Sequence, residues 1–326
     1  MKTIKLILSI LFLLTNIIYA EENKITKFSD YYMAVKIVSA EMASLVNENG
    51  YRIKYNDGDI GWVAAEEFNR MYLPIGKNYY DIDSIEMFTL IEYWLKNLKI
   101  IENSDGNVSA DIVMPGGSKE YFDGTKDISS LRLIVYKEVE SYLRLMLKWA
   151  TRGIGKNINI GIPTPLSDNS IYYLGAKIIK AHKSNSATTK GYTVQYPEGD
   201  IGWITEEIFK KMYIYIGSIE DIYNPISNEF IEKFTYNIFS DEAWENRTGI
   251  KRLTIDTLPE YTISIEKALN EKETKELLYE KVGRHLNFIK KWGLYGVRDS
   301  PPYNANLDYT TNENKNSFKN LFKLNN

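Results

Sequence analysis

Two copies of a short acidic motif contain the residues whose types and spacing could support chemistry. The run Gly-Asp-Ile-Gly-Trp occurs twice, and in each copy its aspartate, Asp59 or Asp200, precedes a glutamate, Glu66 or Glu207, by seven residues. Such a pair can act as general acid and base or can hold a hard cation. Alternatively, the aspartate orders a turn and the glutamate complements the start of a helix. The spacing differs from that of a calcium-binding loop, so we assign no catalytic and no metal-binding residues.

The tryptophan that ends each copy, Trp62 or Trp203, is the next candidate. An aromatic ring on a hairpin can stack on a sugar or a peptide, or it can anchor the core beside Phe68 and Met71. The sequence favours the core, but the hairpin face remains the best candidate for a binding surface. The candidate ligand-binding residues are Tyr55, Asp59, Trp62, Tyr196, Asp200 and Trp203.

Few other residues suit catalysis. The chain has two histidines and no cysteine, which leaves few ligands for a transition metal and no disulfides. His182 falls in a predicted polar loop without a triad pattern nearby, and His285 falls on the apolar stripe of a predicted helix. The sequence contains no phosphate loop, nucleophile elbow or dinucleotide fingerprint. We therefore expect no cofactor.

The acidic motif belongs to a longer duplication. Segments of 27 residues that begin at Gly50 and Gly191 align without a gap and are identical at 14 positions. The separation of 141 residues between them also relates residues 31–38 to residues 172–179. A period of this length exceeds that of solenoid repeats. The duplication therefore predicts two copies of a whole domain.

The duplication continues to the end of each copy, where Trp149 and Trp292 correspond at a separation of 143 residues. The sequence thus predicts an α+β fold of two tandem homologous domains, residues 21–155 and residues 170–298. Each is expected to contain a small β-hairpin or sheet module packed on helices and to end in a long amphipathic helix. The join lies near residues 155–169, and residues 299–326 are expected to form a loose polar tail.

The first part of each domain has the periodicity of strands. Residues 32–40 are rich in β-branched and aromatic side chains, which is typical of a strand. Residues 51–55 alternate apolar and polar side chains, and Asn-Asp-Gly then marks a turn into a strand at 60–63. Apolar side chains three and four residues apart in 64–72 predict a short helix.

The second part of each domain is expected to be mainly helical. Residues 83–98 predict a helix, and residues 103–127 predict a loop or a small hairpin. A long helix is predicted at 130–151, ended by Gly153. Its apolar stripe and the matching stripe of the second copy are Val135, Val139, Tyr142, Met146 and Trp149, and Leu278, Val282, His285, Ile289 and Trp292.

The N-terminus has the features of a secretory signal peptide, residues 1–20. Lys2 and Lys5 precede an apolar run that ends at Tyr19 and Ala20. The run is shorter than the roughly 20 residues of a membrane-spanning helix. After cleavage of the signal peptide, we expect no integral membrane segment. The mature protein would be periplasmic or secreted. Loss of the two lysines changes the net charge from −3 to −5, which makes nucleic acid an unsuitable partner.

The repeated segment resembles two groups of proteins. Its strand, glycine-containing turn and Gly-Trp-Val opening are similar to bacterial SH3-like modules, through Tyr55, Gly58, Gly61, Trp62 and Val63. This resemblance implies a small β-barrel that binds cell-wall peptides, although the helix at 64–72 departs from the pattern. Residues 175–181 and 191–213 resemble small phage and prophage proteins of unknown role. Those proteins usually act in the cytosol, which does not agree with a signal peptide.

Together these features favour an exported, non-enzymatic binding protein with two homologous modules. Its partner would be a cell-envelope component, either peptide or glycan, or another protein. Tandem weak sites suit binding because linkage increases avidity. The alternatives are a glycan or peptidoglycan hydrolase that uses carboxylates such as Asp59 and Glu66, and a structural or assembly protein of phage or prophage origin.

Overall fold

The computed structural model describes residues 28, 30–77, 91, 98–113, 119–155, 158–186, 188–197, 200–218, 221–249, 252–265 and 271–296. Within these residues the fold is a mixed α+β arrangement with six helices and three antiparallel sheets. None of the described helices is long and apolar enough to cross a membrane. The predicted signal peptide and the predicted polar tail lie outside the described residues.

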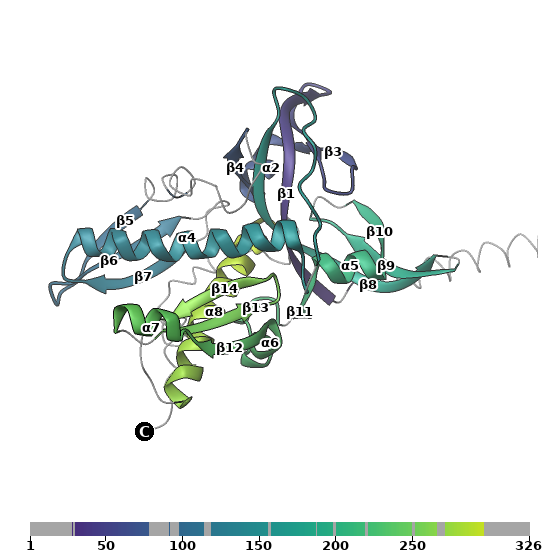
Figure 1. Cartoon of the computed structure of the whole chain (residues 1–326). Helices are drawn as coiled ribbons and strands as arrows, with labels where there is room; N and C mark the ends of the chain where they lie inside the picture. Colours follow the sequence, from purple (N-terminus) through teal and green to yellow (C-terminus); the bar gives the residue numbers. More distant parts are fainter. Residues whose placement is uncertain are drawn as a thin grey trace, which may run out of the picture.

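The largest sheet is a curled, antiparallel half-barrel that draws on both halves of the chain (Figure 1). Six strands lie in the order β10-β9-β8-β1-β2-β3, while β11 pairs with β1 and β4 pairs with β8. Their bounds are β1 (Asp30–Leu45), β2 (Glu48–Lys54), β3 (Ile60–Ala64), β4 (Tyr72–Gly76), β8 (Ile171–Ser186), β9 (Thr189–Gln195), β10 (Ile201–Thr205) and β11 (Ile214–Ser218).

The two longest strands, β1 and β8, pair at the centre of this sheet. Val35 lies opposite Ala176, and these residues are 141 positions apart, the separation that relates the two copies of the repeated sequence. The pairing on either side follows the same symmetry: Ala34 lies opposite Lys177, and Lys36 lies opposite Gly175. The predicted strand at 32–40 is confirmed within β1, which is longer because its second half continues into the hairpin with β2.

The predicted hairpins and short helices are also confirmed. Helices α2 (Ala65–Met71) and α5 (Glu206–Met212) follow β3 and β10. Phe68 is fully buried under the first hairpin, as Phe209 is under the second. Gly58 has a φ of 93° in the turn between β2 and β3, a conformation that glycine adopts without strain. We call β2, β3, α2 and the second half of β1 the first lobe, and β9, β10, α5 and the second half of β8 the second lobe.

Two smaller sheets pack against the long helix α4 (Ile128–Arg152). Within residues 103–127, β6 and β7 pair as a hairpin, one of the two predicted forms. The predicted helix at 83–98 lies mostly outside the described residues, and its last residue begins β5. The bounds are β5 (Leu98–Glu102), β6 (Val108–Val113), β7 (Lys119–Thr125), β12 (Thr235–Ser240), β13 (Leu253–Thr257) and β14 (Tyr261–Ile265), with helices α6 (Asn228–Phe234) and α7 (Glu242–Thr248).

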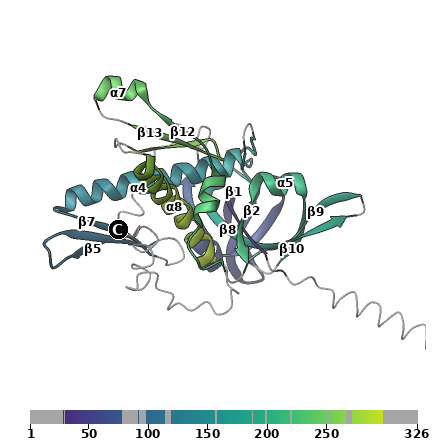
Figure 2. The same cartoon turned by 90° about the horizontal axis from the view of Figure 1, so that it is seen from below.

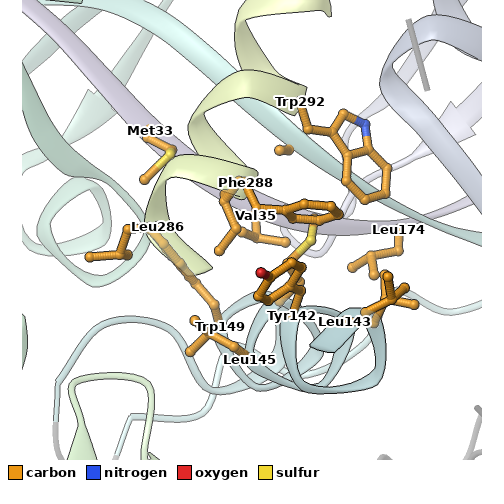
Figure 3. Close-up of a cluster of buried hydrophobic side chains, with 14 of the residues drawn as sticks. Met33, Val35, Tyr142, Leu143, Leu145, Trp149, Leu174, Leu286, Phe288 and Trp292 are labelled. Atoms are coloured by element: carbon orange, nitrogen blue, oxygen red, sulfur yellow. The ribbon is translucent and has the colours of Figure 1, made fainter. Parts of the chain in front are cut away.

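The long helix α4 and its counterpart α8 (Glu271–Gly296) cross beside β1 and β8 (Figure 2). The predicted stripes are confirmed, because each described member is fully buried; the side chain of Leu278 lies outside the described residues. Figure 3 shows Tyr142, Trp149, Phe288 and Trp292 in the resulting core. The rings of Tyr142 and His285, which occupy the same stripe position, meet edge to face with centroids 4.6 Å apart. Gly153 ends α4 with a φ of 74°, as expected.

Each lobe also has a small core that includes a residue from the other half. The first contains Ile53, Phe68 and Tyr72 together with Tyr173 of β8. The second contains Val194, Phe209 and Ala34 of β1. The predicted domain boundaries, residues 21–155 and residues 170–298, stay a prediction. In space, the two halves share one sheet and one main core. His182 lies in β8, so its assignment to a loop was wrong; pairing with β9 extends the strand to Ser186.

Candidate functional site

The outer faces of the two lobes have the same construction. In the first lobe, Glu41, Arg52 and Trp62 lie side by side across β1, β2 and β3. The corresponding row of the second lobe is His182, Thr193 and Trp203 across β8, β9 and β10. A second row beside each one comprises Ser39, Lys54 and Ile60 in the first lobe, and Lys180, Gln195 and Ile201 in the second. We call each set of six residues the outer face of its lobe.

Trp62 and Trp203 lie on these outer faces rather than in the core. Strand alternation points Val63 inward instead, so the favoured interpretation of the tryptophans as core anchors was wrong. Each indole packs closely on a glycine of the neighbouring strand: a Cβ on Gly50 or Gly191 would lie 2.4 Å from the ring. Trp62 is half-buried, whereas Trp203 is 38% exposed. The second lobe thus presents an aromatic surface to solvent.

The predicted carboxylates do not form a buried pair. Asp59 and Asp200 are exposed, as are Glu66 and Glu207. It is the side chain of Asp57, not that of Asp59, that orders the first turn, by accepting a hydrogen bond from the Asp59 amide at 3.0 Å. Among the described residues, no cluster of histidines and carboxylates could hold a metal ion.

Two of the predicted residues, Tyr55 and Tyr196, come together at the centre of the large sheet. They lie beside Lys36 and Lys177, which project from β1 and β8 on either side of the Val35–Ala176 pair. The ammonium of Lys36 is 5.4 Å from the ring centre of Tyr55 and 5.9 Å from that of Tyr196. The ammonium of Lys177 is 5.8 Å and 4.7 Å from the same two centres. We call these four residues the lysine–tyrosine cluster.

The two lysines of the lysine–tyrosine cluster are buried, and its two tyrosines are half-buried. Lys36 and Lys177 are only 7% and 3% exposed. Burial lowers the pKa of Lys36, and the like charge of Lys177 lowers it further, although Tyr196 acts in the opposite direction. Burial raises the pKa of Tyr196 to about 12. Aromatic faces stabilise ammonium groups by cation–π attraction, so the rings offset part of the cost of burying two like charges.

Sequence reasoning missed the two lysines. The signal was present, because each lysine interrupts an apolar strand at the same position of the repeat. A charged residue in an apolar strand is expected to be paired or exposed, and only the pairing of β1 with β8 brings the two together. The cluster could hold a small anion, and a lysine with a lowered pKa is also a better nucleophile than a solvated one.

The segment that joins the two halves lies across the outer face of the first lobe. The Leu166 amide donates to the Ser39 hydroxyl at 3.3 Å, and the Ser167 hydroxyl donates to the Glu41 carboxylate at 2.5 Å. The Lys54 ammonium donates to the Thr164 hydroxyl at 2.6 Å. The Asn56 amide donates to the Gly161 carbonyl, also at 2.6 Å. Residues 161–167 therefore cover part of this face, which the sequence did not indicate.

Comparison of the chain with protein-family models, with curated proteins and with solved structures found no match. The resemblances to SH3-like modules and to phage proteins therefore stay hypotheses.

Proposed function

We propose that this chain is an exported, non-enzymatic binding protein and that the outer face of the second lobe contacts a component of the cell envelope, a peptide or a glycan. One observation carries the proposal. On the edge strand β10, Ile201 is 66% exposed and Trp203 is 38% exposed, and both project from the same outer face. An apolar and aromatic pair beside polar side chains is typical of a recognition surface.

The position of this pair at the edge of the sheet supports the same proposal. Strand β10 is the last in the order β10-β9-β8-β1-β2-β3. An edge strand that carries exposed apolar side chains attracts a partner segment unless something covers it. The strand is short, which limits the contact to a few residues of the partner and suits weak binding.

We further propose that the two halves are homologous domains that arose by duplication. The support is a set of reciprocal contacts between corresponding residues. Strand β4 of the first half pairs with β8, and β11 of the second half pairs with β1. The molecule then has two outer faces of related construction, and the ligand of one face can differ from the ligand of the other.

The alternatives have less support. A hydrolase needs a carboxyl group whose surroundings keep it protonated, commonly through burial, and Asp59, Asp200, Glu66 and Glu207 are exposed. A structural or assembly role has no specific contact in its favour among the described residues.

The proposal is tested with purified protein and an isolated cell-envelope fraction. We expect the protein to sediment with the envelope fraction, and we expect the fraction to protect Trp203 from quenching by acrylamide. Protection is measured as the difference between the unaltered protein and Trp203→Phe. The matched control is Trp62→Phe on the other outer face. The proposal is contradicted if the protein does not sediment with the envelope fraction and the fraction does not protect Trp203 from quenching.

A further inference from the structure

The contacts of residues 161–167 show what kind of segment fits an outer face. The segment has neither helical nor strand structure, and Pro163 and Pro165 restrict it to an extended form. Pro163 is buried. The segment offers hydrogen-bond donors to Ser39 and Glu41, and it accepts hydrogen bonds from Lys54 and Asn56. The occupant of the first outer face is thus an extended peptide that contains prolines.

The corresponding face of the second lobe is more open. Ser39 is fully buried beneath the segment, whereas its counterpart Lys180 is half-buried. Trp62 is half-buried, whereas Trp203 is exposed. Phe28 approaches this face, with its ring centre 4.8 Å from that of His182.

The second face also has a different hydrogen-bonding character. Where Ser39 and Glu41 accept hydrogen bonds from the joining segment, the second lobe has Lys180 and His182. Lysine is a donor without an acceptor, and an imidazole can donate. No carboxylate lies on the second outer face. Its ligand therefore has to present an acceptor to Lys180 and can present another to His182, and a carboxylate is the acceptor that an ammonium binds most strongly.

We infer that the outer face of the second lobe binds an extended, acidic, proline-containing peptide of a partner protein. This inference rests on the proposed function and narrows its ligand to a peptide. Trp203 provides the aromatic surface on which a proline ring packs, as in other grooves that bind proline-rich segments. Lys180 and His182 contact carboxylates of the peptide. The first outer face does not bind such a peptide, because residues 161–167 already occupy it. These residues belong to the same chain, so they compete with an effective concentration in the millimolar range.

The test uses the full exported protein and a labelled synthetic peptide. The peptide has the sequence of residues 160–168 with two changes, Leu166→Glu and Ser167→Glu, which supply acceptors at the residues that contact Ser39 and Glu41 in the first lobe. Binding is measured by fluorescence anisotropy at low and high salt. We expect saturable binding that weakens at high salt, since charge attraction contributes to it.

Protein variants identify the face that binds. Trp203→Ala is expected to weaken binding about tenfold, as loss of a central aromatic contact commonly does. Lys180→Ser should weaken it less and should reduce the effect of salt. Trp62→Ala is the matched control and should leave binding unchanged. Circular dichroism establishes that each variant is folded, and Lys180→Ser still tests the face if Trp203→Ala does not fold.

Peptide variants test the chemistry of the ligand. The unaltered sequence of residues 160–168 should bind more weakly than the peptide with two added glutamates, and so should that substituted peptide with Pro163→Gly and Pro165→Gly. Absence of saturable binding, or binding that is insensitive to both Trp203→Ala and Lys180→Ser, would overturn the inference. If the envelope fraction still protects Trp203 in that case, the binding function stands with a different ligand. If it does not, both proposals fail.

Discussion

The indole of Trp149, on the long helix of the first half, donates a hydrogen bond to the carbonyl of Met212, the last residue of α5 in the second half, at 3.1 Å. Trp292 donates in the same way to Met71, the last residue of α2, at 3.0 Å. The carbonyls at a helix C-terminus lack a partner within the helix. Each long helix therefore completes the short helix of the other half, and the halves depend on one another.

Loss of either indole donor should destabilise the whole protein. We expect Trp149→Phe and Trp292→Phe each to lower the free energy of unfolding by about 2–4 kcal/mol, because a buried carbonyl loses its partner and the smaller ring leaves a cavity. Urea denaturation measures the change. Trp203→Phe is the matched control and should change stability by no more than about 0.5 kcal/mol, as at other exposed positions. A stability change confined to one half of the molecule would contradict the interdependence.

The contact of each outer-face tryptophan with a glycine can be tested directly. A Cβ at position 191 would lie 2.4 Å from the Trp203 ring and 2.5 Å from the Ile204 carbonyl oxygen. We expect Gly191→Ala to lower stability by about 1–3 kcal/mol, because both the ring and the backbone have to shift. The emission of Trp203 should also change.

The matched control for Gly191→Ala is Gly61→Ala. There the nearest atom, in the Tyr55 ring, would lie 3.6 Å from the new Cβ, which is an ordinary contact. Its effect should stay within about 1 kcal/mol, since it adds no clash. Equal losses in the two variants would mean that the glycine–tryptophan contact has no special role.

His285 should make stability depend on pH. Its ring is fully buried; Nδ1 donates to the Lys281 carbonyl at 2.7 Å, so Nε2 of the neutral ring accepts from the Ser141 hydroxyl at 2.7 Å. Burial lowers its pKa from 6.5 to about 4. The neutral ring therefore supports the folded state fully above pH 6.5, and this contribution is lost as the pH falls toward 4, because the unfolded chain takes up the proton first.

The loss due to His285 should approach about 3 kcal/mol at the acidic end of this range. His285→Gln keeps a hydrogen-bonding side chain but does not titrate. We expect its stability, measured by denaturation from pH 7 to pH 4, to vary less than that of the unaltered protein. Parallel curves for the two proteins would show that His285 is not the cause, since the carboxylates titrate in both.

Lys36 should be replaceable by an apolar residue. Removal of a buried ammonium that faces Lys177 eliminates a desolvation cost and a repulsion, and it loses cation–π contacts with the tyrosines. We expect Lys36→Met to leave stability at pH 7 unchanged or to raise it by up to about 2 kcal/mol. Thermal denaturation measures the change. A loss of similar size would mean that the ammonium has an essential partner.

The same variant has a predicted pH dependence. The pKa of Lys36 is lowered in the folded state, so the folded protein releases this proton before the unfolded chain does. The unaltered protein should therefore gain stability relative to Lys36→Met as the pH rises from neutrality toward 10.5, the ordinary lysine value. A constant difference across this range would contradict the assignment.

The sequence by itself determined the hairpins, the short helices and the long helices, and it determined which side of the strand at 51–55 and of the long helices is buried. The period-two alternation of residues 51–55 and the stripe from Val135 to Trp149 identified the inward faces correctly. These features are local, because strand and helix geometry relates a residue to neighbours two to four positions away. The repeat likewise revealed that the same elements occur twice.

The tertiary structure decided which distant segment covers each face. Nothing local to Lys36 indicates that Lys177 will lie beside it, because that depends on the pairing of β1 with β8. Nothing local to Trp62 and Trp203 distinguishes them, since they end the same five-residue run. The first lies on the outer face that residues 161–167 partly cover and is half-buried, and the second is exposed. Contacts between residues so far apart depend on how the whole chain packs, and the spacing of side chains within one element carries no information about it.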